Sequence, residues 1–262
     1  MNRTRNLLDE ALDLNNDNKG SRVVVIEDCV ETSGAFVIHH LIKRNLSLPS
    51  SLIVFVAFSQ PFSHYERILR KLGCNLVMQR ENGRFHFLDM LSMQCPDGEE
   101  DKLCEGGLVS LYGKIQKAVE VSSSTEGNKN SVTIMIDDIS LMEVAANGSS
   151  NHALDFLHYC LTLTSDFGCT LVILSHEDVY SNMEKPMLML QMEYLADVLI
   201  KAEPLATGLA TDVHGQVSLL IYFLTVVNRG RYEKGSLKTK TSNFQFKIRD
   251  NNVECFYPGS QT

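Results

Sequence analysis

The sequence lacks any apolar stretch long enough to cross a membrane. The longest candidate, residues 219–227, has about half of the roughly 20 residues that a bilayer-spanning helix needs. The first ten residues contain Arg3 and Arg5 but no apolar segment after them, so no secretory signal is predicted. We therefore expect a soluble intracellular protein with no membrane partner.

The spacings typical of metal and redox sites are also missing. The chain has seven cysteines and eight histidines, but no C-x-x-C pair and no H-E-x-x-H motif. The scattered cysteines are predicted to be buried thiols in a reducing compartment. His39 and His40 are adjacent on a predicted helix and face different directions, so we do not expect them to share a metal ion. No metal site is predicted.

A working phosphate-binding loop is absent where one would be expected, after the apolar strand at residues 22–27. Such a loop reads G-x-x-x-x-G-K-[ST], because glycines let backbone amides approach phosphate, lysine neutralises it and the hydroxyl holds magnesium. Here Cys29 stands at the first glycine, Ala35 at the lysine and Phe36 at the hydroxyl. Only Gly34 remains of the pattern.

Acidic residues add to this loss. Glu27, Asp28 and Glu31 put negative charge where an anion would bind. The sequence therefore predicts a nucleotide-binding frame that has lost its nucleotide chemistry, and it predicts no catalytic residue.

The composition agrees with one globular unit. The chain has 262 residues, 44% of them hydrophobic, and a mean hydropathy near zero, which permits a large core. Residues 1–20 are predicted to form an N-terminal helix and linker that pack on the core, and residues 21–262 a single domain. The net charge of −8 argues against a surface that is basic throughout, although it permits a local basic patch.

Apolar strands alternate with amphipathic helices along most of the chain. Helices are expected at residues 6–14, 34–46, 60–72, 108–121, 151–166 and 185–195, and strands at 22–27, 51–58, 74–78, 84–88, 132–136, 170–174, 196–201, 216–227, 244–248 and 253–257. Ser63 and Glu66 are spaced as a capping box, and Asn82-Gly83 as the turn of a hairpin. Parallel strands followed by terminal antiparallel strands are typical of an α/β RecA-like ATPase core.

Polar residues follow two of these strands. Asp137 and Asp138 end one strand, and Ser175 and His176 end the next. In RecA-like cores an acidic residue at such a strand end orients magnesium-bound water, and we expect its strand to lie next to the first strand. Two simpler explanations stay open: the Asp pair caps the following helix, and Ser175-His176 closes a turn.

A basic segment near the C-terminus contrasts with the acidic chain. Residues 229–249 contain seven Lys and Arg residues and a single acidic residue, Glu233. Such a hairpin is expected to contact RNA phosphates with little base specificity, and the predicted RNA-binding residues are Arg229, Arg231, Lys234, Lys238 and Lys240. The alternative is a solvated hairpin that binds nothing.

Several segments of the chain resemble subunit six of the Elongator complex, with a plant form expected. They are the degenerate loop, the strands ending at Asp137-Asp138 and Ser175-His176, and the Asn228-Arg229-Gly230-Arg231 entry to the hairpin. The resemblance covers nearly the whole chain and rests on order and overall pattern. It implies a RecA-like fold without a functional phosphate loop.

The resemblance also implies partners. Members of the family form a heterohexameric ring with subunits four and five, which joins the catalytic Elongator subassembly, binds tRNA and supports wobble-uridine modification. It implies linked roles in transcription elongation, a cytoplasmic and nuclear location, and no cofactor in this subunit. Two alternatives stay open: an active NTPase with an unusual loop, and a scaffold without RNA contact.

Overall fold

The computed structural model describes residues 7–12, 22–91, 103–123, 131–146, 148–180, 186–205, 213–224, 237–249 and 252–259, without the side chains of 103–106, 222–224 and 237–239. The helices in these ranges are α1 (Leu7–Ala11), α2 (Ala35–Ser47), α3 (Phe62–Lys71), α4 (Leu76–Glu81), α5 (Leu103–Ser123), α6 (Ile139–Ala145), α7 (Ser150–Phe167), the 3-10 helix η2 (Glu177–Tyr180) and α8 (Met187–Leu195). The strands are β1 (Arg22–Asp28), β2 (Ser51–Ala57), β3 (Phe85–Asp89), β4 (Ser131–Ile136), β5 (Thr170–His176), β6 (Val198–Glu203), β7 (Gly215–Leu224), β8 (Leu237–Arg249) and β9 (Asn252–Phe256).

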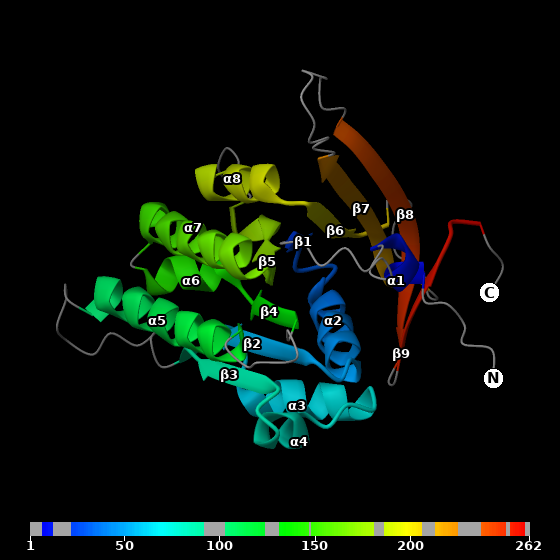
Figure 1. Cartoon of the computed structure of the whole chain (residues 1–262). Helices are drawn as coiled ribbons and strands as arrows, with labels where there is room; N and C mark the ends of the chain where they lie inside the picture. Colours follow the sequence, from blue (N-terminus) through cyan, green and yellow to red (C-terminus); the bar gives the residue numbers. More distant parts are fainter. Residues whose placement is uncertain are drawn as a thin grey trace, which may run out of the picture.

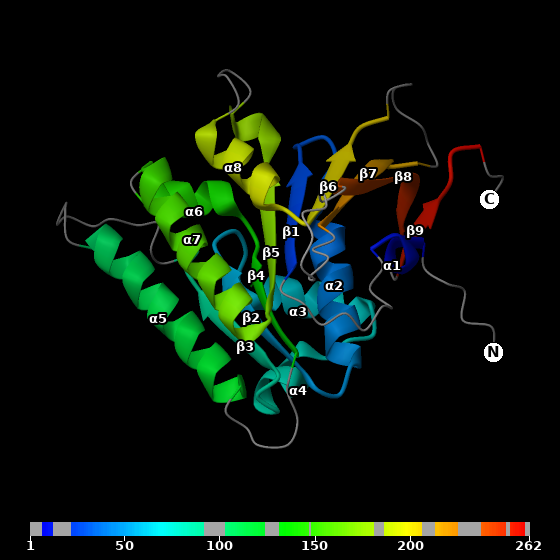
Figure 2. The ribbon, with the colours of Figure 1, turned by 45° about the horizontal axis from the view of Figure 1, so that its top comes forward.

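These strands form one sheet in the order β3-β2-β4-β5-β1-β6-β7-β8-β9. The first six run parallel, and β7, β8 and β9 are antiparallel to their neighbours. Figure 1 shows the antiparallel strands at one side of the molecule, and in Figure 2 β1 and β6 point to the same edge of the sheet. Ligands of open α/β sheets bind at this edge, where parallel strands end.

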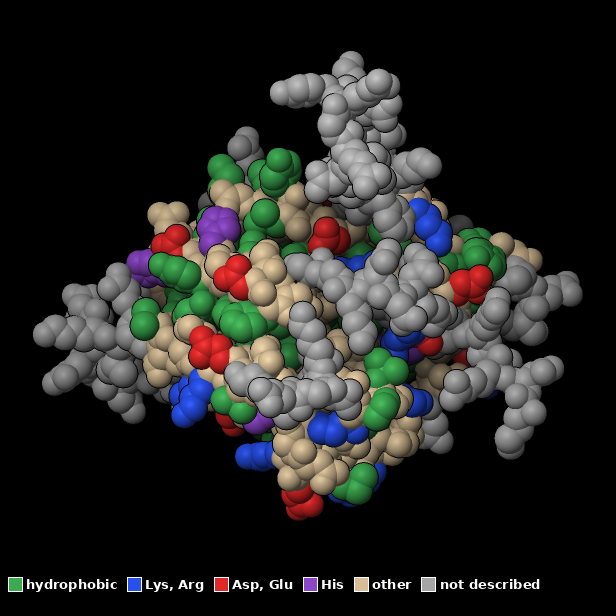
Figure 3. All heavy atoms as spheres, viewed as in Figure 1, with side chains coloured by type: hydrophobic (Ala, Val, Ile, Leu, Met, Phe, Trp, Pro, Cys, Tyr) green, Lys and Arg blue, Asp and Glu red, His purple; other side chains and the backbone are tan. Residues whose placement is uncertain are grey.

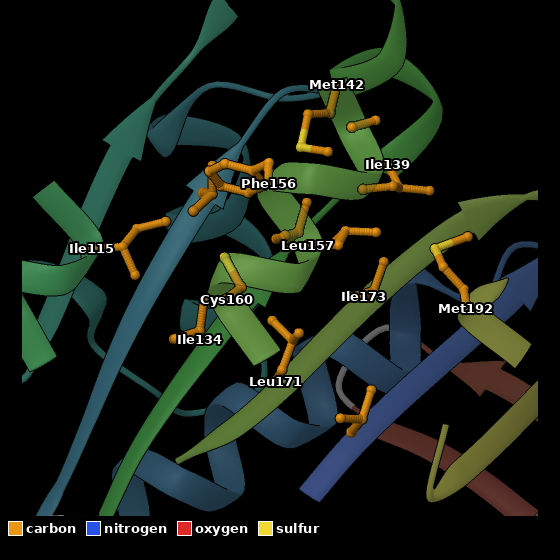
Figure 4. Close-up of a cluster of buried hydrophobic side chains, with 14 of the residues drawn as sticks. Ile115, Ile134, Ile139, Met142, Phe156, Leu157, Cys160, Leu171, Ile173 and Met192 are labelled. Carbon is orange, nitrogen blue, oxygen red and sulfur yellow. The ribbon is translucent and has the colours of Figure 1, made fainter. Parts of the chain in front are cut away.

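Helices cover both faces of the parallel strands, which explains why these strands are apolar without alternation. One core cluster joins one face of the sheet to α5, α6, α7 and α8, and Figure 4 shows Ile115, Met142, Leu157 and Met192 converging on it. The other cluster joins the opposite face to α1, α2, α3 and α4. The sheet is therefore held from both sides, and its strand ends have fixed positions.

Two local predictions in the α3–α4 region are wrong. Residues 74–78 form no strand; Asn75 caps α4 instead, and its side-chain oxygen accepts a hydrogen bond from Met78 N at 3.1 Å. The strand β3 consequently pairs in parallel with β2 rather than in a hairpin. Ser63 is not a helix cap either, because the N-cap of α3 is Pro61, without a side-chain hydrogen bond.

The prediction that the strand ending at Asp137 lies next to β1 is also wrong. The strand β4, which precedes Asp137, pairs with β2 and β5, and β5 lies between it and β1. A helix missed from the sequence, α6, begins directly after β4. The end of β5 therefore sits between the ends of β1 and β4.

Candidate functional site

The degenerate loop connects β1 to α2 and is folded tightly on the protein itself. Thr32 N donates to Cys29 O at 3.0 Å, and Gly34 precedes the first residue of α2. A Cβ atom at Gly34 would lie 2.9 Å from Ile26 Cγ2, so glycine is required here by close packing on β1. Phe36 is buried and stacks on Phe246 with ring centroids 4.5 Å apart.

Side chains of the chain itself take hydrogen bonds from the loop amides. Gly34 N donates to Asp28 Oδ2 at 2.6 Å, and Val30 N donates to Asp178 Oδ2 at 2.8 Å. Ala35 N lies 3.2 Å from its acceptor, Ser33 Oγ. In phosphate-binding loops, amides at this helix start point at the anion. Here the carboxylate of Asp28 occupies the start of α2.

His176 joins two of the strand ends. Its Nδ1 contacts Asp28 Oδ1, and its Nε2 lies 3.2 Å from Asp138 Oδ2. The two carboxyl side chains are almost fully buried, with 1% and 4% exposure, whereas the His176 side chain is 30% exposed. The geometry follows from the sheet order, because β5 delivers His176 between Asp28 of β1 and Asp138 after β4.

This arrangement holds a proton on the imidazole. Hydrogen bonds to Asp138 and then to Asp28 raise the pKa of His176 to about 10, although burial opposes the shift. Burial would raise the pKa of Asp138, but hydrogen bonds from His176, Ser140 and Leu141 N outweigh it and hold that pKa below its ordinary value. The imidazolium thus neutralises carboxylates at the strand ends, where a nucleotide site would use lysine and magnesium.

Asp137 has a structural environment of its own. Its carboxylate accepts hydrogen bonds from Phe58 N at 2.7 Å, Ser59 N at 3.1 Å and Tyr65 Oη at 2.5 Å. Burial raises the pKa of Asp137 to about 6. The side chain therefore fastens the end of β4 to the end of β2 and to α3.

Of the two simpler explanations for the strand-end residues, the structure supports the helix cap but not the turn, because Ser175 and His176 are the last two residues of β5. Asp138 is the N-cap of α6, and its Oδ1 accepts a hydrogen bond from Leu141 N at 3.0 Å. Ser175 is fully buried, with its Oγ 3.8 Å from Met189 Sδ. The structure thus brings together Asp138 and His176, while Asp137 and Ser175 face other partners.

A second buried charge pair was missed from the sequence. Lys201 Nζ lies 2.7 Å from Glu27 Oε2 and 2.9 Å from Glu193 Oε1. Burial lowers the pKa of Lys201, but the two carboxylates outweigh it and raise that pKa above its ordinary value. Glu27 and Lys201 are direct register partners on β1 and β6. A charge inside each of two largely apolar strands was the available signal.

The predicted RNA-binding residues lie mostly outside the described residues. This applies to Arg229, Arg231 and Lys234, while Lys238 belongs to β8 without a described side chain. Lys240 is exposed on β8. The RNA assignment stays a prediction.

None of the helices in the described ranges is long and apolar enough to cross a membrane. Among the same residues, no group of three or more His, Cys, Asp and Glu side chains is arranged to hold a metal ion.

Comparison with solved structures confirms the predicted fold class. A KaiC-like protein, PH0186 from Pyrococcus horikoshii OT3, superposes with a TM-score of 0.55 over 90% of both chains, at 12% sequence identity. At this identity the likeness concerns the fold alone. The α/β RecA-like architecture, with its parallel sheet and antiparallel C-terminal strands, is established.

Comparison with protein sequences confirms the predicted resemblance. The chain is 28% identical to Elongator complex protein 6 of Homo sapiens and 30% identical to that of Mus musculus, each over 242 residues that cover 87% of this chain and 88% of the relative. The Dictyostelium discoideum protein of the same name is 22% identical over 320 residues, covering 92% of this chain and 91% of the relative. The sequence model of the family described as Elongation complex protein 6 matches residues 6–250, and this chain therefore belongs to that family.

Proposed function

We propose that this chain is a non-catalytic subunit of the Elongator complex. In this proposal it forms a heterohexameric ring with subunits four and five, and the ring binds tRNA, joins the catalytic subassembly and supports wobble-uridine modification. The proposal includes a cytoplasmic and nuclear location and the linked role in transcription elongation. Membership of the family supports the assignment to the Elongator complex, and the geometry of the loop supports a role without catalysis.

The observation that carries the non-catalytic role is the filled anion site. Asp28 accepts the Gly34 amide and contacts His176, so a phosphate at the start of α2 would meet a buried carboxylate. A phosphate would also lack the loop lysine, because Ala35 stands at that position. Charge-assisted hydrogen bonds contribute about 1.5–3 kcal/mol each, so both losses weaken nucleotide binding substantially.

Calorimetric titration tests this part of the proposal. The isolated chain, titrated with magnesium and ATP at millimolar concentrations, is expected to give no saturable heat. Saturable binding that Asp137→Asn abolishes would overturn the proposal and favour an active NTPase. Turnover by the chain alone would have the same meaning, whereas turnover only in a mixed ring would leave a subunit role.

Native mass measurement tests the assembly. The chain has a mass of 29.4 kDa, and co-expression with subunits four and five is expected to give a species several-fold heavier that contains all three proteins. A chain that remains monomeric in their presence would contradict the ring.

The RNA-binding role is assigned to the basic hairpin. Replacing Arg229, Arg231, Lys238 and Lys240 by Gln should weaken binding of the ring to a tRNA transcript. It should also lower the slope of log affinity against log salt by about 0.7–0.9 for each phosphate that the hairpin no longer neutralises. An unchanged slope would reject the hairpin and favour a scaffold that does not touch RNA there.

A further inference from the structure

A second basic surface lies on α2 and α3, far from the hairpin in sequence. Residues 35–84 contain seven Lys and Arg residues and two Glu, in a chain whose net charge is −8. Helix α3 also has basic residues in its last turn, Arg70 and Lys71. Six side chains make up this surface, here named the α2–α3 basic band: Lys43, Arg44, His64, Arg67, Arg70 and Lys71.

The band is continuous across the two helices. Residues three and four apart lie on one helix face, which places Arg67, Arg70 and Lys71 together on α3. Lys71 lines a hollow of about 690 Å³ with Lys43 and Arg44 of α2. Towards the other end of α3, Arg67 and Arg70 line a second hollow, of about 410 Å³. Figure 3 shows Lys and Arg side chains over the lower part of the molecule, where Figure 1 places α2, α3 and α4.

Three of these cations are available to a partner. Arg44 pairs with Asp9 at 2.7 Å, and Arg70 pairs with Glu66. In contrast, Lys43, Arg67 and Lys71 are exposed and form no ion pair within the described ranges. Cations held together without counter-charges attract an anion with several charges.

We propose that the α2–α3 basic band binds the phosphodiester backbone of RNA, as a contact separate from the hairpin. This inference rests on the proposed RNA-binding role and adds a second surface to it. The exposed cations contact phosphates and carry little base specificity, because no side-chain hydrogen bond within the described part of the chain fixes their direction toward base edges. Their contribution is affinity that weakens with salt.

The composition of the two hollows favours RNA over an acidic peptide. Apolar side chains such as Leu8, Phe36 and Val253 line the first hollow only. The second hollow combines its cations with polar side chains, among them Gln60 and Ser63. Cationic side chains line both hollows, whereas Pro61 is the single apolar residue among those that line the second, so the repeated charges of a polyanion match the whole band.

The position of β8 makes a joint contact with the hairpin possible. Arg249, at the end of β8, lines the first hollow, and Lys240 is exposed near the other end of the same strand. The extended strand between these two residues spans roughly 30 Å. One folded RNA can therefore contact the band and Lys240 of β8 together.

Matched charge variants test the band in the assembled ring. The band variant carries Arg67→Gln and Lys71→Gln, and the control carries Lys114→Gln and Lys117→Gln, two exposed lysines on α5, across the sheet. Fluorescence anisotropy with a labelled tRNA transcript is measured from low to high salt, beside native mass and thermal melting. The band variant should lower the salt slope by about 1.4–1.8, which is roughly a 25- to 60-fold loss of affinity near 0.1 M salt.

The other results decide between the possible partners. The control, and a charge-retaining Arg67→Lys, Lys71→Arg variant, should bind RNA as the unchanged ring does. An unchanged slope in the band variant would overturn the inference, and so would a lighter assembly, since that result identifies an acidic protein partner. The hairpin variant is measured in parallel. An unchanged salt slope in the hairpin variant alone rejects the hairpin assignment, and an unchanged salt slope in the band variant alone rejects only this inference.

Discussion

Replacing His176 by Gln tests the charge arrangement at the strand ends. The change removes an imidazolium that contacts Asp28 and Asp138, both buried. Charge-assisted hydrogen bonds contribute about 1.5–3 kcal/mol each, and the 30% exposure of His176 argues for the lower end. Glutamine can recover one neutral hydrogen bond of about 1 kcal/mol. The free energy of unfolding should therefore fall by about 2 kcal/mol.

The pH dependence gives this prediction a second readout. The pKa of His176 is about 10 in the folded protein and about 6.5 ordinarily, so its stabilisation is complete below pH 6.5 and is lost as the pH rises through 10. The difference between wild type and His176→Gln should be largest near pH 6 and shrink steadily above it. Protonation of Asp138, whose pKa is lowered, reduces the stabilisation at strongly acidic pH.

Urea denaturation followed by circular dichroism measures both effects. His158→Gln is the matched control, because His158 is exposed on α7 and should change stability by no more than about 0.5 kcal/mol. Equal stability of His176→Gln and wild type at pH 6 would refute the bridging charge, as would a difference that widens toward pH 10.

Two further predictions concern packing and the second buried pair. Gly34→Ala should destabilise the fold by about 1–3 kcal/mol, because the new methyl group would lie 2.9 Å from Ile26 Cγ2. In Gly113→Ala, on α5, the new methyl group meets nothing within 4 Å, and this variant should stabilise the fold by up to about 1 kcal/mol. The melting temperatures of the two variants should therefore shift in opposite directions. Lys201→Met should lower the free energy of unfolding by about 3 kcal/mol, because it removes the ammonium group beside buried Glu27. Lys114→Met, at an exposed position on α5, should lower it little in the same denaturation assay. Similar losses of stability in the two variants would contradict a buried pair.

The fold was largely predictable because its strands are buried on both faces. Continuous apolar runs such as 51–57 and 170–174 are typical of strands that are buried on both faces of a parallel sheet. The region of α4 was harder, because Val77 and Met78 are exposed on a short helix and give no helical pattern. Its one local signal was the capping side chain of Asn75.

The site was predictable in its residues but not in its geometry. The loss of the loop pattern is visible in the sequence, and so are Asp138 and His176. Their contact depends on the order of strands in the sheet, which places β5 between β4 and β1. Such long-range order leaves no mark in the local pattern of any one strand, and the register pairing of Glu27 with Lys201 escaped prediction for the same reason.

The imidazolium between Asp28 and Asp138 has a consequence for regulation. In an ordinary nucleotide-binding subunit, the charges at this edge are balanced by molecules whose supply varies with the energy state of the cell. Here the balancing charge is covalently part of the polypeptide and cannot diffuse away. In the proposed non-catalytic role, this edge needs no bound nucleotide to balance its buried carboxylates, and we expect any response of the assembly to nucleotide to come from its other subunits.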